Sequence, residues 1–149
     1  MCTPPSIGIE DPWHPCPVAF DPADLPASAR PLLTERHLAT LTTLRADGSP
    51  HVVPVGFTWD APARRVRVIC SGDSVKARNA ARGTRAAVSV VDGRFWLTLE
   101  GPAHLLEDEA EVREGERRYA ERYREPRENP SRVVLAIQVD RVLGNLPKE

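Results

Sequence analysis

The sequence predicts a single, mainly β domain with a few short helices, folded as a compact antiparallel barrel. Three observations lead to this prediction. Six short segments alternate apolar and polar residues with the period of a β-strand. Asp-Gly pairs at 47–48 and 92–93 stand between such segments and are typical of hairpin turns. The 149 residues fit one domain and leave little room for a second, and closing the sheet into a barrel removes its exposed edges.

Residues 1–25 form a Pro-rich extension for which regular structure is not expected. Its six prolines lack a backbone donor, and each disfavours helix at the residue before it. Trp13, Val18 and Phe20 are the residues of this segment that we expect to lie on the body of the fold or on a partner subunit. No metal site is expected, because the Cys and His residues of the extension match no zinc-ligand spacing. These residues are Cys2, His14 and Cys16.

The first predicted elements are a short helix over 29–36 and a hairpin made of strands over 38–45 and 51–59. The first of these strands is rich in Thr, which favours strands. The returning strand contains Pro54 and Gly56, which weaken an ordinary β ladder at that point. These two residues predict an edge strand, a bulge, or a place where another group approaches the backbone closely.

A third strand is expected over 65–70, followed by a short basic helix over 75–82. The intervening Ser-Gly-Asp-Ser at 71–74 can cap that helix. The free N–H groups and the positive pole of a helix start suit a phosphate, and Lys76 and Arg78 add positive charge there. A capped surface helix with solvated Lys and Arg fits the same spacing equally well.

The second half of the chain predicts three more strands and a longer helix. Strands are expected over 85–91 and 95–104, the helix over 109–124, and the last strand over 132–142. Favourable i,i+4 pairs of Glu and Arg support the helix, and Pro126 follows its end. Six strands are therefore expected in all.

Composition and motif content exclude several classes of function. The net charge of −1 gives no overall attraction to nucleic acid, and no apolar run approaches the roughly 20 residues of a membrane helix. The N-terminus lacks the pattern of a secretory signal, and three scattered cysteines form no disulfide framework, so a cytoplasmic protein is expected. No dinucleotide fingerprint, P-loop, nucleophile elbow or zinc-protease motif is present. Neither His37 nor His51 is expected to act as a catalytic base.

The segment 35–59 resembles the opening hairpin of the pyridoxamine-phosphate-oxidase-like split barrels. The similarity is closest to the actinobacterial branch that uses the deazaflavin coenzyme F420, and within it to the F420-dependent biliverdin reductases. It extends over roughly 32–144, nearly the whole chain outside the extension. The other segments that carry it are Lys76-Ala-Arg-Asn79, 91–101, 118–124 and 132–144.

The resemblance implies a fold, an assembly and a set of binding residues. The fold is a six-stranded antiparallel split β-barrel over 26–149, and the assembly is a homodimer with two cofactor sites at the subunit interface. Beside the cofactor ring, the resemblance places His51, Val53, Pro54, Val55 and Gly56. At the phosphate it places Ser71, Ser74, Lys76 and Asn79, with Arg78 nearby. It places Trp96 either close to the cofactor from the partner subunit or within the subunit interface.

The implied activity is an F420-dependent oxidoreductase that transfers hydride from reduced deazaflavin to a small organic acceptor. Biliverdin, giving bilirubin, or a related tetrapyrrole is the leading acceptor. No catalytic residue of the protein is expected, because the cofactor supplies the hydride chemistry. Two alternatives stay open at this point. One is an FMN-dependent oxidase or reductase of the same fold, and the other is a non-catalytic protein that binds the cofactor or haem.

Overall fold

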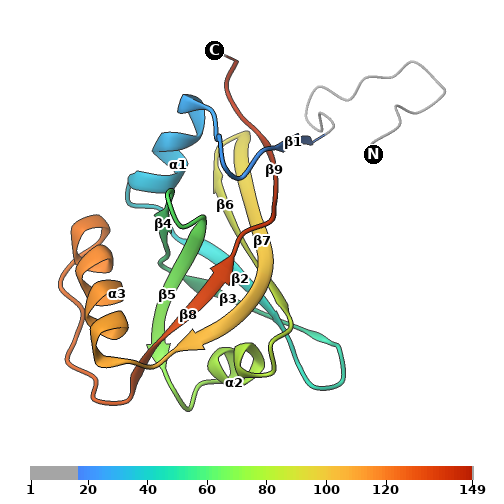
Figure 1. Cartoon of the computed structure of the whole chain (residues 1–149). Helices are drawn as coiled ribbons and strands as arrows, with labels where there is room; N and C mark the ends of the chain where they lie inside the picture. Colours follow the sequence, from blue (N-terminus) through green and yellow to red (C-terminus); the bar gives the residue numbers. More distant parts are fainter. Residues whose placement is uncertain (1–16, 149) are drawn as a thin grey trace.

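One antiparallel sheet, curled into a barrel that does not close, forms the centre of the protein (Figure 1). The computed structural model describes residues 17–148, which contain nine strands: β1 (Val18–Phe20), β2 (Ala39–Leu44), β3 (Pro50–Val55), β4 (Thr58–Asp60), β5 (Arg65–Ser71), β6 (Arg85–Asp92), β7 (Phe95–Leu106), β8 (Arg132–Gln138) and β9 (Arg141–Asn145). The strand order is β3-β2-β6-β7-β8-β5-β4, with β9 beside β7 and β1 beside β9. The predicted mainly β, antiparallel fold is confirmed. The opening of the barrel, its split, lies between β3 and β4, the strands at the two ends of this order.

The long strand β7 joins the two halves of the barrel by pairing with two strands in succession along one edge. Its first half pairs with β9 from Trp96 to Glu100, and its second half pairs with β8 from Ala103 onwards. Gly101 lies at the change of partner. A Cβ atom built on Gly101 would lie 1.8 Å from the backbone oxygen of Gln138, so only glycine fits this crossing.

In the described part of the chain, three α-helices and one 3-10 helix pack against the barrel: η1 (Ala27–Ala29), α1 (Arg30–Thr34), α2 (Val75–Ala81) and α3 (Glu109–Arg122). Figure 1 shows α2 across one end of the barrel and α3 along the outer side of β5 and β8. The close approach of α3 depends on the buried Gly115, because a Cβ there would lie 2.6 Å from Cγ2 of Val134. Within the described residues, the helices thus cover one end and one side, and none of them covers the outer face of β2, β3 and β6.

The barrel interior is filled by aliphatic side chains from every long strand, which is the expected result of their alternating sequences. Among the side chains with no exposed surface are Leu41, Phe57, Val88, Leu97, Leu99, Leu135 and Ile137. The turns that join these strands are those predicted at the Asp-Gly pairs. Gly48 and Gly93 both have positive φ, at 86° and 62°, as tight hairpin turns require.

The described residues contain nine strands where six were expected. Two of the expected strands are each divided into two, which accounts for two of the three additional strands. The segment 51–59 breaks after Val55, because β3 pairs with β2 whereas β4 pairs with β5. The segment 132–142 breaks at Val139 and Asp140, where the chain passes from β8 to β9. Pro54 and Gly56 had predicted an edge, a bulge or a close approach, and β3 is indeed an edge strand.

The N-terminal extension contains one regular element that was not expected there. Val18–Phe20 forms β1, which pairs with β9 between Val142 and Gly144. Both Val18 and Phe20 therefore contact the body of the fold, as anticipated, whereas Trp13 lies outside the described residues. So do the three residues weighed as metal ligands, namely Cys2, His14 and Cys16. Within 17–148, no group of three potential metal ligands is found, and no helix is long and apolar enough to cross a membrane.

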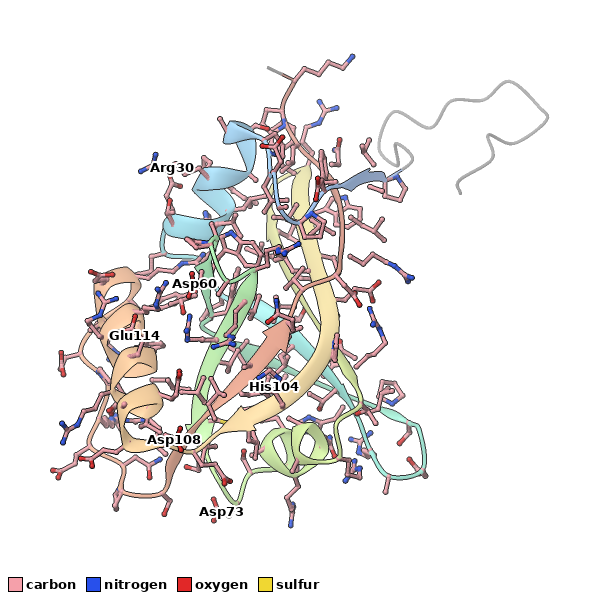
Figure 2. The ribbon with its side chains drawn as sticks, viewed as in Figure 1. Arg30, Asp60, Asp73, His104, Asp108 and Glu114 are labelled. Atoms are coloured by element: carbon pink, nitrogen blue, oxygen red, sulfur yellow. The ribbon has the colours of Figure 1, made fainter. Side chains whose placement is uncertain are left out.

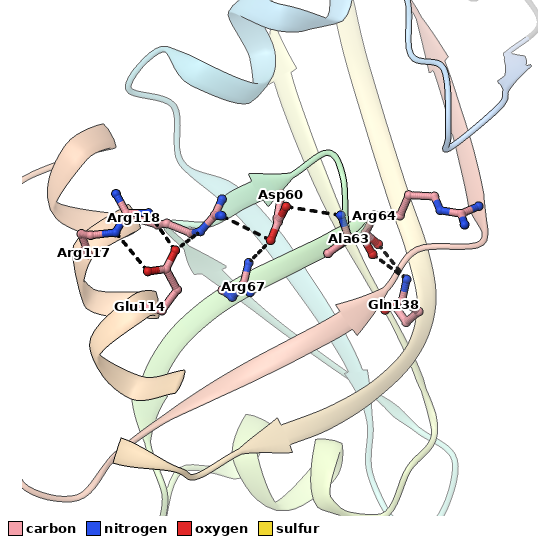
Figure 3. A network of polar contacts seen from close by, with 8 residues as sticks. All are labelled: Asp60, Ala63, Arg64, Arg67, Glu114, Arg117, Arg118 and Gln138. Carbon is pink, nitrogen blue, oxygen red and sulfur yellow. Dashed lines mark hydrogen bonds and ion pairs between the residues drawn. The ribbon is translucent and has the colours of Figure 1, made fainter. Parts of the chain in front are cut away.

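A buried ion-pair network attaches α3 to the β4–β5 hairpin (Figure 3). Asp60 and Arg67 are 9% and 7% exposed, and their Oδ2 and Nη1 atoms are 2.8 Å apart. Arg118 from α3 reaches the same carboxylate at 3.3 Å and also donates to Glu114. Hydrogen bonds from Arg117 and Arg118 hold the pKa of Glu114 at about 2. Arg67 can be buried because its charge is paired with that of Asp60.

The C-terminal end of α3 is held by Arg122 and Tyr123. The guanidinium of Arg122 lies 4.5 Å from the centre of the Phe57 ring, and the hydroxyl of Tyr123 donates to the carbonyl of His37 at 2.6 Å. Arg122 also donates to three backbone carbonyls, at 2.9, 2.9 and 2.6 Å. These belong to Leu32, Glu35 and Phe57. This end of α3 therefore ties α1, the start of β2 and the β3–β4 break to one another.

Candidate binding site

A cavity of about 340 Å³ lies in the split of the barrel. Pro54, Val55 and Gly56 at the end of β3 form one wall, and β5 from Val68 to Ser71 forms another. These two strands do not pair with each other, so the cavity occupies the place where the sheet fails to close. Lys76 of α2, Tyr119 of α3 and the loop between α3 and β8 complete the lining.

The polar end of the cavity is built where the loop before β8 docks on the end of β5. The Gly72 N–H donates to the carbonyl of Ser131 at 2.8 Å, and the Asn129 side-chain amide donates to Ser71 Oγ at 2.8 Å. Because Ser71 Oγ accepts this bond, its own hydroxyl proton is free to be donated to a ligand. The end of β5 therefore presents a fixed hydroxyl donor beside Lys76.

Four cationic side chains line this cavity, and no acidic side chain of the described chain does. They are Lys76, Arg124, Arg127 and Arg132. Arg132 is 9% exposed and pairs with Glu116 at 2.6 Å. The other three have no carboxylate partner among residues 17–148. The cavity therefore attracts anions, although the chain as a whole has a net charge of −1.

Cys70 also lines the cavity, but its thiol is not activated. Burial raises the pKa of the Cys70 thiol, and the nearby Ser74 hydroxyl and Lys76 ammonium only partly oppose this effect. The thiol is thus protonated at neutral pH and forms a neutral part of the wall. Among residues 17–148, the other titratable groups of the lining are the four cations and Tyr119, and Ser71 adds a hydroxyl.

The group that approaches the backbone at Gly56 is a pair of tyrosine rings. A Cβ atom on Gly56 would lie 3.0 Å from Cε2 of both Tyr119 and Tyr123. The centres of the two rings are 5.0 Å apart. The close approach that Gly56 predicted is therefore present within the chain itself, and it sets the position of the aromatic wall of the cavity.

A second cavity of about 450 Å³ adjoins the first. Its lining consists of Arg36, Leu38, Tyr119, Tyr123 and Arg124. Tyr119 and Arg124 belong to both cavities, so they form the boundary between them. Arg36 donates to the backbone carbonyl of Tyr123, which fixes it at this wall.

The structure brings together part of the predicted binding set. Pro54, Val55, Gly56, Ser71 and Lys76 all line the first cavity, although they come from three separate elements. The phosphate-binding group predicted around α2 is spread out. Ser74 caps the helix by accepting from the Ala77 N–H, whereas Asp73 is exposed at the turn before α2 (Figure 2).

The remaining predicted residues lie outside the lining. Asn79 is buried and donates to the Thr43 hydroxyl at 3.0 Å, and Arg78 is exposed on α2. His51 and Val53 lie on the face of β3 that turns toward the barrel interior, since they pair with the inward residues of β2. Nδ1 of His51 is buried and has no hydrogen-bond partner in the described chain. Trp96 lies on the outer face of β7, opposite Val91 of β6.

Sequence reasoning missed the contribution of α3, of the start of β8 and of the loop between them to the lining. The first cavity is also lined by Tyr119, Arg124, Arg127, Asn129 and Arg132, and none of these was singled out for binding. The available signal was a run of arginines and prolines between the predicted helix and the last strand. Its position beside α2 depends on the fold, so the sequence alone gave no reason to connect it with Lys76.

Comparison with known proteins places this site in a family. An F420H2-dependent biliverdin reductase of Mycobacterium tuberculosis is 58% identical over 113 residues, which cover 76% of this chain and 82% of that protein. A solved F420 reductase shares the fold with a TM-score of 0.64 and 24% identity, covering 79% of this chain and 98% of its own. A conserved hypothetical protein of Mycobacterium tuberculosis does so with a TM-score of 0.62 and 22% identity, covering 72% and 75%. The resemblance seen in the sequence is thereby confirmed. Residues 25–145 match the pyridoxamine 5′-phosphate oxidase family, and the chain belongs to that family.

Proposed function

We propose that the protein is an F420-dependent oxidoreductase that reduces a small organic acceptor, with biliverdin as the leading substrate. The observation that carries this proposal is the cationic cavity in the split of the barrel, in a chain 58% identical to an F420H2-dependent biliverdin reductase. A cavity of this size is within the usual range for a cofactor or drug-sized ligand.

The donors around Lys76 fit the phosphate of such a cofactor. Lys76 supplies an unpaired ammonium, Ser71 a free hydroxyl proton, and Arg132 a guanidinium held by Glu116. Charge-assisted hydrogen bonds of this kind are the usual means of holding phosphate. Pro54 to Gly56 would then lie beside the cofactor ring, with backbone and shape as the main contacts.

When bound, reduced F420 would supply the hydride. The protein's own residues therefore have to bind the cofactor and the acceptor, orient them and exclude competing reactions. The lining contains no carboxylate or imidazole that could act as an acid or base, and Cys70 is protonated. Reduction of biliverdin adds hydride to the central bridging carbon and one proton to a pyrrole nitrogen. We propose that this proton comes from solvent.

Transfer of a deuterium label tests the proposal directly. Reduced F420 carrying deuterium at the transferring ring carbon should deliver it to the central bridging carbon of bilirubin, detected by mass spectrometry and NMR. A primary isotope effect is expected if chemistry limits the rate. Bilirubin formed without label, or tight binding of FMN in place of F420 in parallel titrations, would contradict the assignment and favour the flavin alternative.

We further propose that the protein is a homodimer formed through the outer face of β2, β3, β6 and β7. Leu38, Val52 and Val91 are 70%, 56% and 60% exposed. The strand register places Val52 and Val91 on this face, together with Trp96, and Leu38 directly precedes β2. Exposed apolar side chains that share one sheet face mark an interaction surface. A second copy of the chain is the partner implied by the family resemblance.

Light scattering at micromolar concentration should give twice the monomer mass of 16.5 kDa. Val91→Glu should shift the protein toward the monomer, because it places a carboxylate in an apolar interface. Arg113→Gln, on the exposed side of α3, is the control and should stay dimeric. A monomeric wild type, or a dimer indifferent to Val91→Glu, would exclude this interface.

A further inference from the structure

The positive charge of the first cavity exceeds what one cofactor phosphate needs. Lys76, Arg124 and Arg127 have no carboxylate partner within 17–148, whereas the charge of Arg132 is balanced by Glu116. The phosphate of F420 is a diester with a single negative charge. If Lys76 holds that phosphate beside Ser71, two arginine charges remain for another anionic group.

These two arginines lie on the loop after α3 rather than beside α2. Arg124 is placed between the two cavities, with Tyr119 as the other shared residue. Besides these two residues, the second cavity is lined by Leu38, Tyr123 and Arg36. A ligand in this position would meet the guanidinium groups of Arg124 and Arg36 and the apolar and aromatic surfaces of Leu38 and the two tyrosines.

From this arrangement we infer that the second cavity is the acceptor site, and that Arg124 binds a carboxylate of a planar, conjugated acceptor. Arg36, which also lines the second cavity, is available to a second carboxylate. The inference rests on the proposed function, which requires an acceptor beside the cofactor cavity, and it adds the substrate class, namely an aromatic or conjugated carboxylic acid. Arginine suits this role because its planar fork matches a carboxylate in two parallel hydrogen bonds.

Two substitutions should separate acceptor binding from cofactor binding. Arg124→Gln should weaken binding of biliverdin about ten- to a hundredfold, the usual effect of losing a charge-assisted hydrogen bond. The same variant should bind oxidised F420 within about twofold of wild type. Lys76→Ala should show the opposite pattern, with F420 weakened about ten- to a hundredfold. Arg113→Gln, which removes one charge from the exposed side of α3, should change neither constant.

The measurements use the full chain. Quenching of tryptophan fluorescence follows biliverdin, and the fluorescence of F420 itself follows the cofactor. Biliverdin dimethyl ester is the decisive probe, since it keeps the conjugated body but has no carboxylate. Wild type and Arg124→Gln should bind the ester equally. In steady-state assays, Arg124→Gln should raise KM for biliverdin far more than it lowers kcat.

Each contrary outcome has a definite meaning. If Arg124→Gln weakens F420 instead of biliverdin, the arginine binds the carboxylates of the cofactor's glutamyl tail, and the inference is wrong. If the variant weakens the ester as much as the free acid, Arg124 only shapes the wall, and the inference is again wrong. If the wild type binds biliverdin through Arg124 but never reduces it with F420, the assignment of Arg124 to carboxylate binding stands, whereas the proposed function fails.

Discussion

Gly101→Ala should lower the free energy of unfolding by about 4 kcal/mol, or prevent folding altogether. The added Cβ would lie 1.8 Å from the Gln138 oxygen and 2.8 Å from the Gln138 carbonyl carbon, both of them backbone atoms. Neither can move without breaking the pairing of β7 with β8 or β9. Urea denaturation, followed by circular dichroism, gives the change in stability.

Two other glycines provide a graded comparison. Gly144→Ala brings Cβ to 2.6 Å from the Trp96 oxygen and should cost less than Gly101→Ala. Gly48→Ala meets no atom within 4 Å, so only its φ of 86° is unfavourable, at a cost of about 1–2 kcal/mol. A Gly101→Ala protein as stable as Gly48→Ala would show that β7 does not make this crossing.

Arg122→Met should lower the free energy of unfolding by about 3 kcal/mol, because three backbone carbonyls lose a charged donor at once. Met keeps most of the apolar contact with Phe57, so the loss reports mainly on the hydrogen bonds. Arg122→Lys should recover only part of the stability, since one ammonium cannot reach carbonyls on α1, on the following loop and before β4 together.

Arg113→Met is the matched control on the same helix. Arg113 is 74% exposed and, within residues 17–148, forms its one ion pair with Glu109, so its replacement should change stability by less than about 0.5 kcal/mol. Thermal unfolding of the three variants beside wild type ranks them. Equal stability of Arg122→Met and Arg113→Met would mean that the end of α3 does not hold the β3–β4 break.

The sequence predicted those parts of the fold that depend on local chemistry. Turns at Gly48 and Gly93, the cap before α2, and the i,i+4 pairing of Glu109 with Arg113 all lie where local rules place them. The division of two strands was not predictable in this way. Alternation of inward residues continues across Gly56, because β3 and β4 both face the same core while pairing with different strands.

The candidate site shows the same limit. Lys76 and Ser71 were selected from one short segment, where a helix start follows a strand. Arg124 and Arg127 come from a loop about fifty positions further on, and this loop reaches the cavity because Asn129 and Ser131 dock on Ser71 and Gly72 at the end of β5. Gly56 was recognised as a point of close approach, but the approaching groups are Tyr119 and Tyr123 of the same chain.

The open edge of the barrel has a consequence for how this scaffold changes during evolution. The cavity is lined by the free end of β3, one side of β5 and a surface loop, so several lining positions contribute neither to the β ladder nor to the interior. Substitutions at Arg124 or Arg127 alter what is bound without a cost in folding, because both side chains are exposed. Lining residues can therefore change during evolution and alter which ligand is bound, whereas the residues of the barrel interior are constrained by packing.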